Sequence, residues 1–332
     1  MHPIDGKVTG STIAHLALIV FAWGTNYPLL KLALRDMAPL TFSTLRLFGG
    51  AAVIAIIAML LGIRSLRPAP GEARRLAASS IFQYAGVLGF ASLGLLYIPA
   101  GRTVVMVYSM PIWAALFASI SGQDRIGARR WLGIVLGASG LALFVNPEVL
   151  GNSSILGAFL VLCAAWSWGI GVVVHRWRPL TTPFLAQAFF QLICSGVVLG
   201  VLALVFEHAA VTRWTPTLVI ILAWNCVIPT AVAVWSWSRV LQQLPAATAG
   251  QFLLATPLVG MAAGSIMFGE AVPPIFLVSA ALIVVGSYFV LPQGPTVGRS
   301  CASRASNRTI VRSRDILKGL RFFAFACVNR FQ

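Results

Sequence analysis

Polar and aromatic side chains interrupt the apolar stretches of this chain, and their chemistry suits them to ligand binding. Amides and hydroxyls can hydrogen-bond to a ligand, and indole rings can stack on a planar or cationic one. The candidate binding residues are Asn26, Tyr84, Ser92, Tyr108, Trp166, Trp168, Trp235 and Gln251. Further polar residues inside these stretches or at their ends are Arg46, Gln83, Ser109, Gln187, Gln191, Asn225 and Trp237. For each tryptophan, ordinary helix packing is the alternative.

Prolines accompany several of these candidates. Tyr108 and Ser109 directly precede the Met110-Pro111 pair, and Gln251 precedes Pro257 by six residues. A proline inside a helix frees the carbonyl four residues earlier and bends the helix. The predicted gating or kink residues are Pro99, Pro111, Pro245 and Pro257. Packing alone is the alternative, because membrane helices tolerate proline.

Ten stretches of 17 or more residues without a charged side chain must position these groups. The chain has 332 residues, 58% of them apolar and 10% charged, whereas about a quarter of the residues of a soluble domain are charged. Each stretch is long enough to cross a bilayer as a helix. This excludes a soluble catalyst, and it excludes a porin-type barrel with short alternating strands. The predicted fold class is an all-α integral membrane protein with ten transmembrane helices.

The charges predict the orientation of these helices. With a cytoplasmic N-terminus, 19 of the 24 Lys and Arg residues fall on the inner side or in the tail, and 5 fall elsewhere. The positive-inside rule therefore places both termini in the cytoplasm, with the helices in the plasma (inner) membrane. Residues 1–11 form the inner N-terminus, and residues 292–332 form a basic, disordered cytoplasmic tail. Because the net charge of +16 is explained in this way, no nucleic-acid partner is expected.

The chain contains an internal duplication at an offset of 145 to 147 residues. Trp23-Gly24 matches Trp168-Gly169, and Pro99-Ala100 matches Pro245-Ala246. Two repeats of five helices follow, at 12–146 and 152–291. Because five is odd, the second repeat enters the membrane from the opposite side and is inverted. Inverted repeats are typical of secondary transporters, whose substrate site lies near the bilayer midplane where the halves meet.

These repeated residues also resemble those of a known family. The matching motifs are Trp23-Gly24-x-Asn26 with Lys31, Pro99-Ala100-Gly101, Ser109-Met110-Pro111, the run from Leu244 to Ala249, and Gly269-Glu270. Over about 12 to 291 the chain resembles the EamA family of the drug/metabolite transporter superfamily. The resemblance implies a ten-helix transporter that exports or exchanges amino acids, nucleobases or other small metabolites. The first repeat departs from the motif, since it has Gln123 where the second has Glu270.

Coupling to an ion is less clearly indicated. All eight acidic residues lie at helix ends or outside the predicted helices, whereas proton relays use carboxylates within the membrane. The candidates for coupling or a charge gate are Lys31, Arg176, Glu270 and His15. Snorkelling of Lys31 and Arg176 toward water is the alternative. Proton coupling and a homodimer both stay open.

A membrane enzyme is the rival hypothesis. Gly137-Ala138-Ser139-Gly140 matches the nucleophile motif of intramembrane serine proteases, in which Ser139 would need a histidine within hydrogen-bond reach. Only His15 lies well inside a predicted helix. No C-x-x-C pair or P-loop occurs, so no metal and no cofactor are expected. The sequence therefore predicts a non-enzymatic carrier that exports or exchanges a small amphipathic metabolite by alternating access, with the lipid bilayer and that metabolite as partners.

Overall fold

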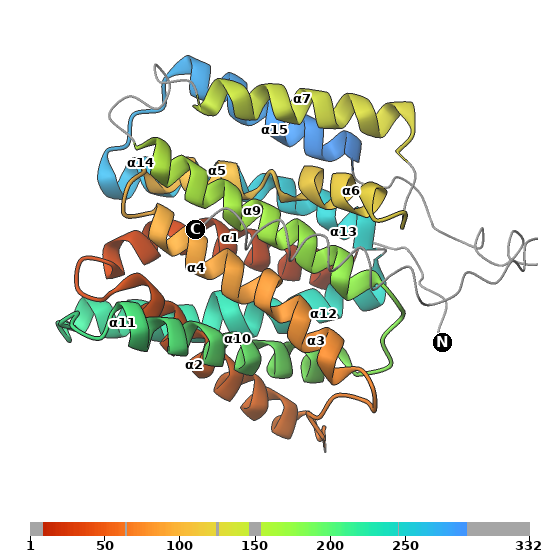
Figure 1. The fold of residues 1–332 in the computed structure, drawn as a ribbon, viewed down its shortest axis with the longest axis vertical. Helices are drawn as coiled ribbons and strands as arrows, with labels where there is room; N and C mark the ends of the chain where they lie inside the picture. Colours follow the sequence, from red (N-terminus) through yellow and green to blue (C-terminus); the bar gives the residue numbers. More distant parts are fainter. Residues whose placement is uncertain (1–8, 64, 124–125, 146–153, 245, 291–332) are drawn as a thin grey trace, which may run out of the picture. The chain divides into compact units, whose positions relative to one another are not determined.

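The computed structural model describes residues 9–63, 65–123, 126–145, 154–244 and 246–290, and within these ranges every regular element is a helix (Figure 1). The first half contains α1 (Gly10–Ala33), α2 (Pro39–Leu60), α3 (Ala73–Ser80), η1 (Ile81–Gly86), α4 (Val87–Gly94), α5 (Ala100–Val107), α6 (Met110–Ile120) and α7 (Ala128–Val145). The second half contains α9 (Ile155–Arg176), α10 (Phe184–Phe206), α11 (Pro216–Asn225), η2 (Cys226–Val232), α12 (Ala233–Gln243), α13 (Ala246–Phe252), η3 (Leu253–Ala255), α14 (Thr256–Phe268) and α15 (Pro274–Val290). The predicted tail lies outside the described residues.

Eight helical segments are long and apolar enough to cross a membrane. Four are the single helices α1, α2, α9 and α10. The other four combine shorter pieces, at 73–94, 100–120, 216–243 and 249–268. Helix α15 is apolar but has only 17 residues, and α7 runs beside it (Figure 1). The chain is thus a multi-pass membrane protein, and the count of ten crossings stays a prediction.

The helical irregularities recur at matching places in the two halves. The π-helical turns η1 and η2 begin 145 residues apart. The chain breaks between α5 and α6 at Tyr108, and the 3₁₀ turn η3 begins 145 residues later, at Leu253. This offset is that of the sequence duplication. π-helical turns are frequent at functional sites. Each half of the chain therefore contains an element of a kind that often forms part of such a site.

Glycines allow α7 and α15 to approach closely. A methyl group added to Gly286 would lie 2.6 Å from the backbone of both Gly133 and Gly137. One added to Gly140 would lie 2.7 Å from the carbonyl oxygen of Ser279. Contacts this short require residues without a side chain, so the Gly133-x-x-x-Gly137 spacing serves helix packing.

All four acidic residues that the structure describes connect one half of the chain to the start of a helix, or to the residues just before it, in the other half. Glu270 accepts hydrogen bonds from the backbone N–H groups of Ala100 and Gly101, at 2.7 and 2.9 Å, where α5 begins. Glu207 accepts two backbone N–H groups at the start of α2, at 2.8 and 2.7 Å. The first N–H groups of a helix lack partners within it and carry partial positive charge, so these carboxylates stabilise both helix ends.

Asp36 and Glu72 make the same kind of connection from the first half to the second. Asp36 accepts a hydrogen bond of 2.8 Å from the hydroxyl of Thr215, the N-cap of α11. Glu72 accepts the hydroxyl and backbone N–H groups of Thr181 and Thr182, which precede α10. These bonds, the Thr182 hydroxyl foremost, lower the pKa of Glu72 from 4.5 to about 2. The halves are therefore tied together at helix starts.

Candidate functional site

A cavity of about 460 Å³ lies between the two halves of the chain. Helices α1, α2 and α4, the turn η1 and the α5–α6 break line it from the first half. Helices α9, α10 and α12 and the turns η2 and η3 line it from the second. The lining runs from the middle of these helices to the end of the bundle where α9 ends and α10 begins. Ligand cavities typically measure about 300 to 1,000 Å³, so a small metabolite fits.

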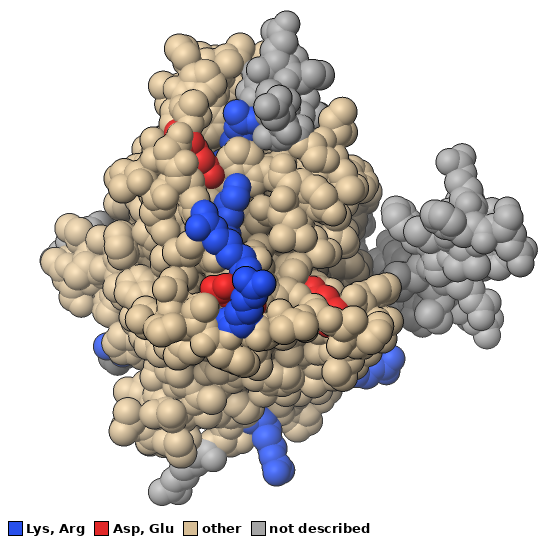
Figure 2. All heavy atoms as spheres, turned by 90° about the vertical axis from the view of Figure 1, so that its left-hand side faces the viewer, with Lys and Arg blue, Asp and Glu red and all other residues tan. Residues whose placement is uncertain are grey.

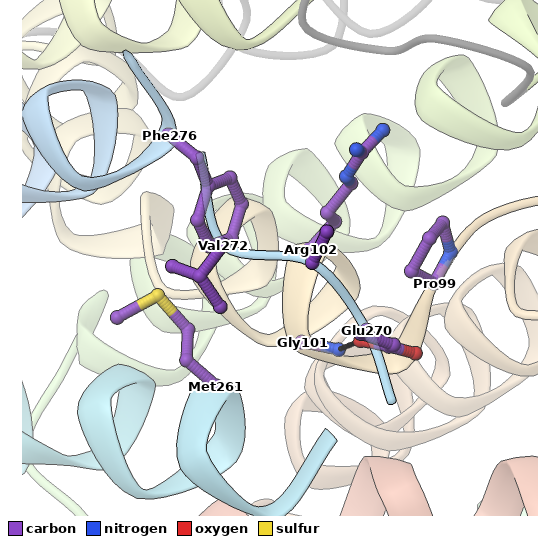
Figure 3. Close-up of a pocket in the computed structure, with 8 residues that line it drawn as sticks. Pro99, Gly101, Arg102, Met261, Glu270, Val272 and Phe276 are labelled. Carbon is purple, nitrogen blue, oxygen red and sulfur yellow. Dashed lines mark hydrogen bonds between the residues drawn. The ribbon is translucent and has the colours of Figure 1, made fainter. Parts of the chain in front are cut away.

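Two other cavities are poorer candidates. One of about 550 Å³ lies between α4 and α10, and its wall is apolar apart from Glu207, which is already bonded to α2. The other, of about 90 Å³, lies beside Glu270, with Met261 and Phe276 in its wall (Figure 3). It has room for a few waters but not for a metabolite.

Four of the eight predicted binding residues line the 460 Å³ cavity between the halves: Asn26, Tyr84, Tyr108 and Trp168. Each comes from a different segment, namely α1, η1, the α5–α6 break and α9. Arg176, predicted as part of a charge gate, lines its end. The structure thus brings together side chains that lie as far as 150 residues apart in the sequence.

The other four predicted binding residues do not line the cavity. Ser92 is buried and donates a hydrogen bond of 3.0 Å to the carbonyl of Gly89. The ring of Trp166 packs edge-on against Trp113, with centroids 5.4 Å apart. Trp235 lies against His15, also at 5.4 Å, and Gln251 is partly buried in α13.

The prolines mark helix starts rather than kinks. Pro111 and Pro257 occupy the first turn of α6 and α14, and Pro99 is the N-cap of α5. Proline is tolerated at these positions because the first N–H groups of a helix have no partner within it. The expected mid-helix kinks are therefore replaced by breaks between short helices. Pro245 lies outside the described residues, and the prolines found inside helices are Pro28 and Pro229.

Arg46 forms a polar centre in the cavity wall. It lies in the apolar helix α2 and is only 6% exposed. Its Nη1 donates to Oδ1 of Asn26 and its Nε donates to Oγ1 of Thr230, both at 2.9 Å. The side chain thus joins α1, α2 and the π-turn η2, a grouping that spacing along the sequence does not reveal.

Aromatic rings and a backbone carbonyl complete the wall. The indole of Trp23 donates a hydrogen bond of 2.9 Å to the carbonyl of Pro229 in η2, and its ring lies 6.3 Å from that of Trp237. Tyr27 lines the same cavity. Trp23 belongs to the repeated Trp-Gly pair, so the duplication is the signal that could have identified it.

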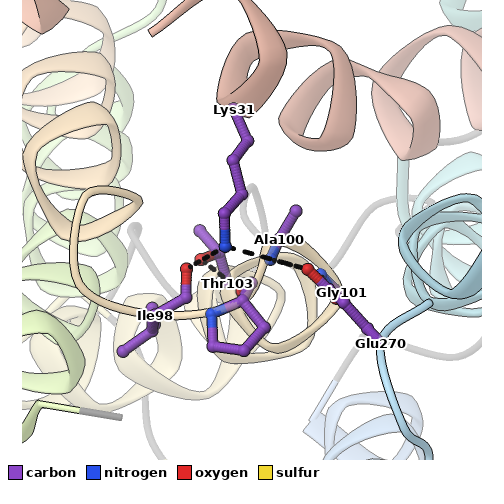
Figure 4. A network of polar contacts seen from close by, with 7 residues as sticks. Lys31, Ile98, Ala100, Gly101, Thr103 and Glu270 are labelled. Carbon is purple, nitrogen blue, oxygen red and sulfur yellow. Dashed lines mark hydrogen bonds and ion pairs between the residues drawn. The ribbon is translucent and has the colours of Figure 1, made fainter. Parts of the chain in front are cut away.

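A polar network lies at the opposite end of the bundle (Figure 4). The Nζ atom of Lys31 donates a hydrogen bond of 3.0 Å to the carbonyl of Ile98 and lies 3.8 Å from Oε1 of Glu270. Glu270 in turn holds the start of α5. Figure 2 shows basic side chains gathered in a strip on one face of the bundle, with acidic side chains beside them. The network joins α1, the α4–α5 turn and the segment after α14.

The remaining charged and nucleophilic candidates lie apart from this network. His15 forms a hydrogen bond of 3.2 Å with Ser236. Ser139 is exposed on α7, so the Ser139–His15 pair that a protease would need is not formed. Among the described residues, no group of three or more His, Cys, Asp and Glu side chains is arranged to hold a metal ion.

These features define a class: a multi-pass helical membrane protein with a ligand-sized cavity between two similar halves. The family model of the EamA-like transporter family matches residues 11–146 and 155–291. The chain therefore belongs to the EamA-like transporter family, within the drug/metabolite transporter superfamily.

Relatives agree with this assignment, and a solved structure agrees with the fold. The chain is 27% identical to "Uncharacterized transporter YoaV" of Bacillus subtilis, covering 81% of this chain and 93% of the relative. It is 22% identical to the "Probable amino-acid metabolite efflux pump" of Escherichia coli, covering 82% and 91%. It is 26% identical to the "Probable terminal-alkyne amino-acid exporter" of Streptantibioticus cattleyicolor, covering 86% and 94%. A crystal structure matches in fold with a TM-score of 0.62 at 17% identity, covering 85% of this chain and 96% of that one.

Proposed function

We propose that this protein is a secondary transporter that moves a small amphipathic metabolite, such as an amino acid or a related compound, by alternating access. We further propose that it exports or exchanges this metabolite across the plasma membrane. The observation that carries the proposal is the 460 Å³ cavity between the two repeats, lined by polar and aromatic groups from both. The names of two relatives as exporters support the outward direction.

The substrate occupies this cavity and contacts Asn26, Tyr84, Tyr108 and Trp168. The aromatic rings offer flat apolar faces, while the amide and hydroxyl groups orient the polar part of the ligand. This division suits an amphipathic molecule. The other four predicted binding residues contribute indirectly, because they pack the helices that carry the cavity wall. They are Ser92, Trp166, Trp235 and Gln251.

Lys31 and Glu270 form the gate at one end of the cavity. In the orientation given by the positive-inside rule, α1 runs outward, so Lys31 lies at the outer end and Arg176, at the end of α9, lies at the inner end. The cavity lining includes Arg176 but not Lys31. This difference supports the proposal that the protein has an inward-open state, in which the network of Lys31, Glu270 and the start of α5 closes the outer end.

Alternating access requires that the inner end close when the outer end opens. Arg176 matches Lys31 in the repeat, so Arg176 has the equivalent position for an inner gate. The α5–α6 break and η3 provide the flexible points, because a helix that is already broken bends at little cost. The two inverted repeats then exchange conformations. Glu270 and His15 are the groups through which a proton could be coupled to this exchange.

Counterflow uptake in proteoliposomes tests the proposal. Purified protein is supplied with a panel of labelled amino acids and nucleobases, and uptake is compared with that of empty vesicles. Trp168→Ala should lower uptake about tenfold, the effect of losing about 1.4 kcal/mol of binding. Trp131→Ala is the matched control, since Trp131 is exposed on α7 and does not line the cavity. An absence of uptake across the panel by folded protein, or equal loss in both variants, would contradict the proposal. Repeating the assay with a pH gradient decides proton coupling.

A further inference from the structure

The cavity wall contains a buried cation without a carboxylate partner. The guanidinium of Arg46 is protonated at neutral pH and has five N–H donors. Its two hydrogen bonds use Nε and Nη1 and end on the neutral oxygens of Thr230 and Asn26. Among the described residues, Nη2 has no hydrogen-bond acceptor, and Arg46 forms no ion pair. A buried charge without a counter-ion is costly, so a ligand that supplies one gains affinity.

The surroundings of Arg46 favour an anion over any other ligand. The described lining of the cavity contains Arg46, His175 and Arg176 but no acidic residue. All four acidic residues that the structure describes are bonded at helix starts elsewhere. A cleft lined with one sign of charge and low-dielectric walls concentrates ions of the opposite sign. The cavity therefore attracts negative charge toward the middle of the helices.

The guanidinium selects an oxyanion, and the apolar cavity wall favours a carboxylate among the oxyanions. Arginine presents its donors as a planar fork that matches the paired oxygens of a carboxylate or a phosphate. In the same cavity wall, the rings of Trp23, Tyr27, Tyr108 and Trp168 provide flat apolar surfaces. These surfaces suit a singly charged carboxylate with an apolar body better than a doubly charged phosphate, whose burial costs more. The volume of about 460 Å³ accommodates a small organic molecule.

We propose that Arg46 binds the carboxylate of the transported substrate, which is a small organic carboxylate with an aromatic or branched apolar body. This inference rests on the proposed function, because it takes the cavity as the substrate site. Asn26 and Thr230 are positioning residues that fix the guanidinium with its remaining donors directed to the ligand. The carboxylate belongs either to a zwitterionic amino acid or to a simple carboxylic acid, and the test distinguishes these two kinds of substrate.

Binding is measured on purified protein in detergent, as ligand-induced thermal stabilisation, with three probes that share one ring. These are 3-phenylpropionate (carboxylate only), phenylalanine (carboxylate and amine) and phenethylamine (amine only). We expect 3-phenylpropionate to stabilise the protein and phenethylamine not to do so. Stabilisation by phenylalanine as well would identify an amino-acid site, and its absence would identify a site for simple carboxylic acids.

The variants assign this binding to Arg46. Arg46→Gln should weaken carboxylate binding about ten- to a hundredfold, the effect of losing charge-assisted hydrogen bonds, and Arg46→Lys should retain part of it. Arg239→Gln is the matched control, because it removes one exposed cation of α12 outside the cavity. Its affinity should equal that of the wild type.

Several outcomes would overturn the inference. They are equal stabilisation by phenethylamine, no stabilisation of the folded wild type by either carboxylate, and unchanged affinity in Arg46→Gln. Should Arg46→Gln not fold, the three probes on the wild type and Arg46→Lys still decide. The proposed function fails separately. Carboxylate binding without counterflow would refute transport alone, whereas counterflow of a nucleobase without carboxylate binding would refute this inference alone.

Discussion

Single carboxylates in this protein act on helix starts rather than in the cavity. Glu72, Glu207 and Glu270 each accept backbone N–H groups from the opposite half of the chain. Their position at helix ends was evident in the sequence, but their partners lie about 109 to 170 residues away. One consequence is that the described cavity wall holds cations without carboxylates, which is the basis of the proposed preference for an anion.

Glu72 should make the stability of the protein depend on pH in the acid range. Its pKa is about 2 in the folded protein against 4.5 ordinarily, so folding favours the ionised form. The stabilisation is therefore complete above pH 4.5 and is lost as the pH falls from 4.5 toward 2. Thermal unfolding in detergent should show that the wild type loses its advantage over Glu72→Gln across this window.

A second variant assigns that effect to its cause. Thr182→Val removes the hydroxyl that contributes most to the lowered pKa of Glu72 and keeps the carboxylate. Its pH-dependent stabilisation should lie between those of the wild type and Glu72→Gln. Identical pH dependence in all three proteins would show that the Glu72 bonds do not form.

At the scale of the element, the sequence predicts that a segment is helical but not which of its side chains face the cavity. Trp166 and Trp168 lie on the same helix about 200° apart, and only Trp168 lines the cavity. Helix α9 is apolar on all sides, so no polar face in its sequence indicates which indole points inward. The π-turns η1 and η2 change the facing of every residue that follows them. Counting residues at 3.6 per turn cannot anticipate that change.

The close contact between α7 and α15 should make the stability of the protein sensitive to any side chain added there. Gly286→Ala places a methyl group 2.6 Å from the backbone of Gly133 and Gly137, and backbone on both sides leaves little room to adjust. The variant should lower the free energy of unfolding by about 1–3 kcal/mol. Gly127→Ala is the control, because nothing lies within 4 Å of its added methyl group. Equal thermal stability of the two variants in detergent would contradict close packing of these helices.

At the scale of the whole molecule, the duplication explains more of the structure than any single motif. Apolar stretches predicted the eight segments that are long enough to span a membrane, because helix length and hydropathy are local properties. The offset of about 145 residues predicted a site where the halves meet, and the cavity lies there. The network around Arg46 could not be predicted, since it depends on how three helices from both halves come together.

The two ends of the cavity have different residues at the position that the repeat makes equivalent, and this difference can be tested. At the proposed outer gate, Glu270 accepts a backbone N–H group at the start of α5, whereas the matching position of the first repeat holds Gln123, whose amide donates to the carbonyl of Val173 at 3.0 Å. A neutral amide cannot pair with a cation as a carboxylate does. The outer gate should therefore be the stronger one, and neutralising Glu270 should make the two ends more alike.

Thiol accessibility measures this balance directly. In a background without the five native cysteines, Val172→Cys places a thiol in the cavity wall. Val211 is 85% exposed between α10 and α11, so Val211→Cys reports the side that is the outer one in the proposed orientation. An impermeant reagent should label position 172 from the cytoplasmic side only. Adding Glu270→Gln removes the partner of Lys31 and should raise outer labelling about five- to thirtyfold, the shift that 1–2 kcal/mol produces. If Glu270→Gln leaves the outer labelling of position 172 unchanged, the Lys31–Glu270 network does not hold the gate. Other contacts would then shield the thiol at position 172 from the outer reagent.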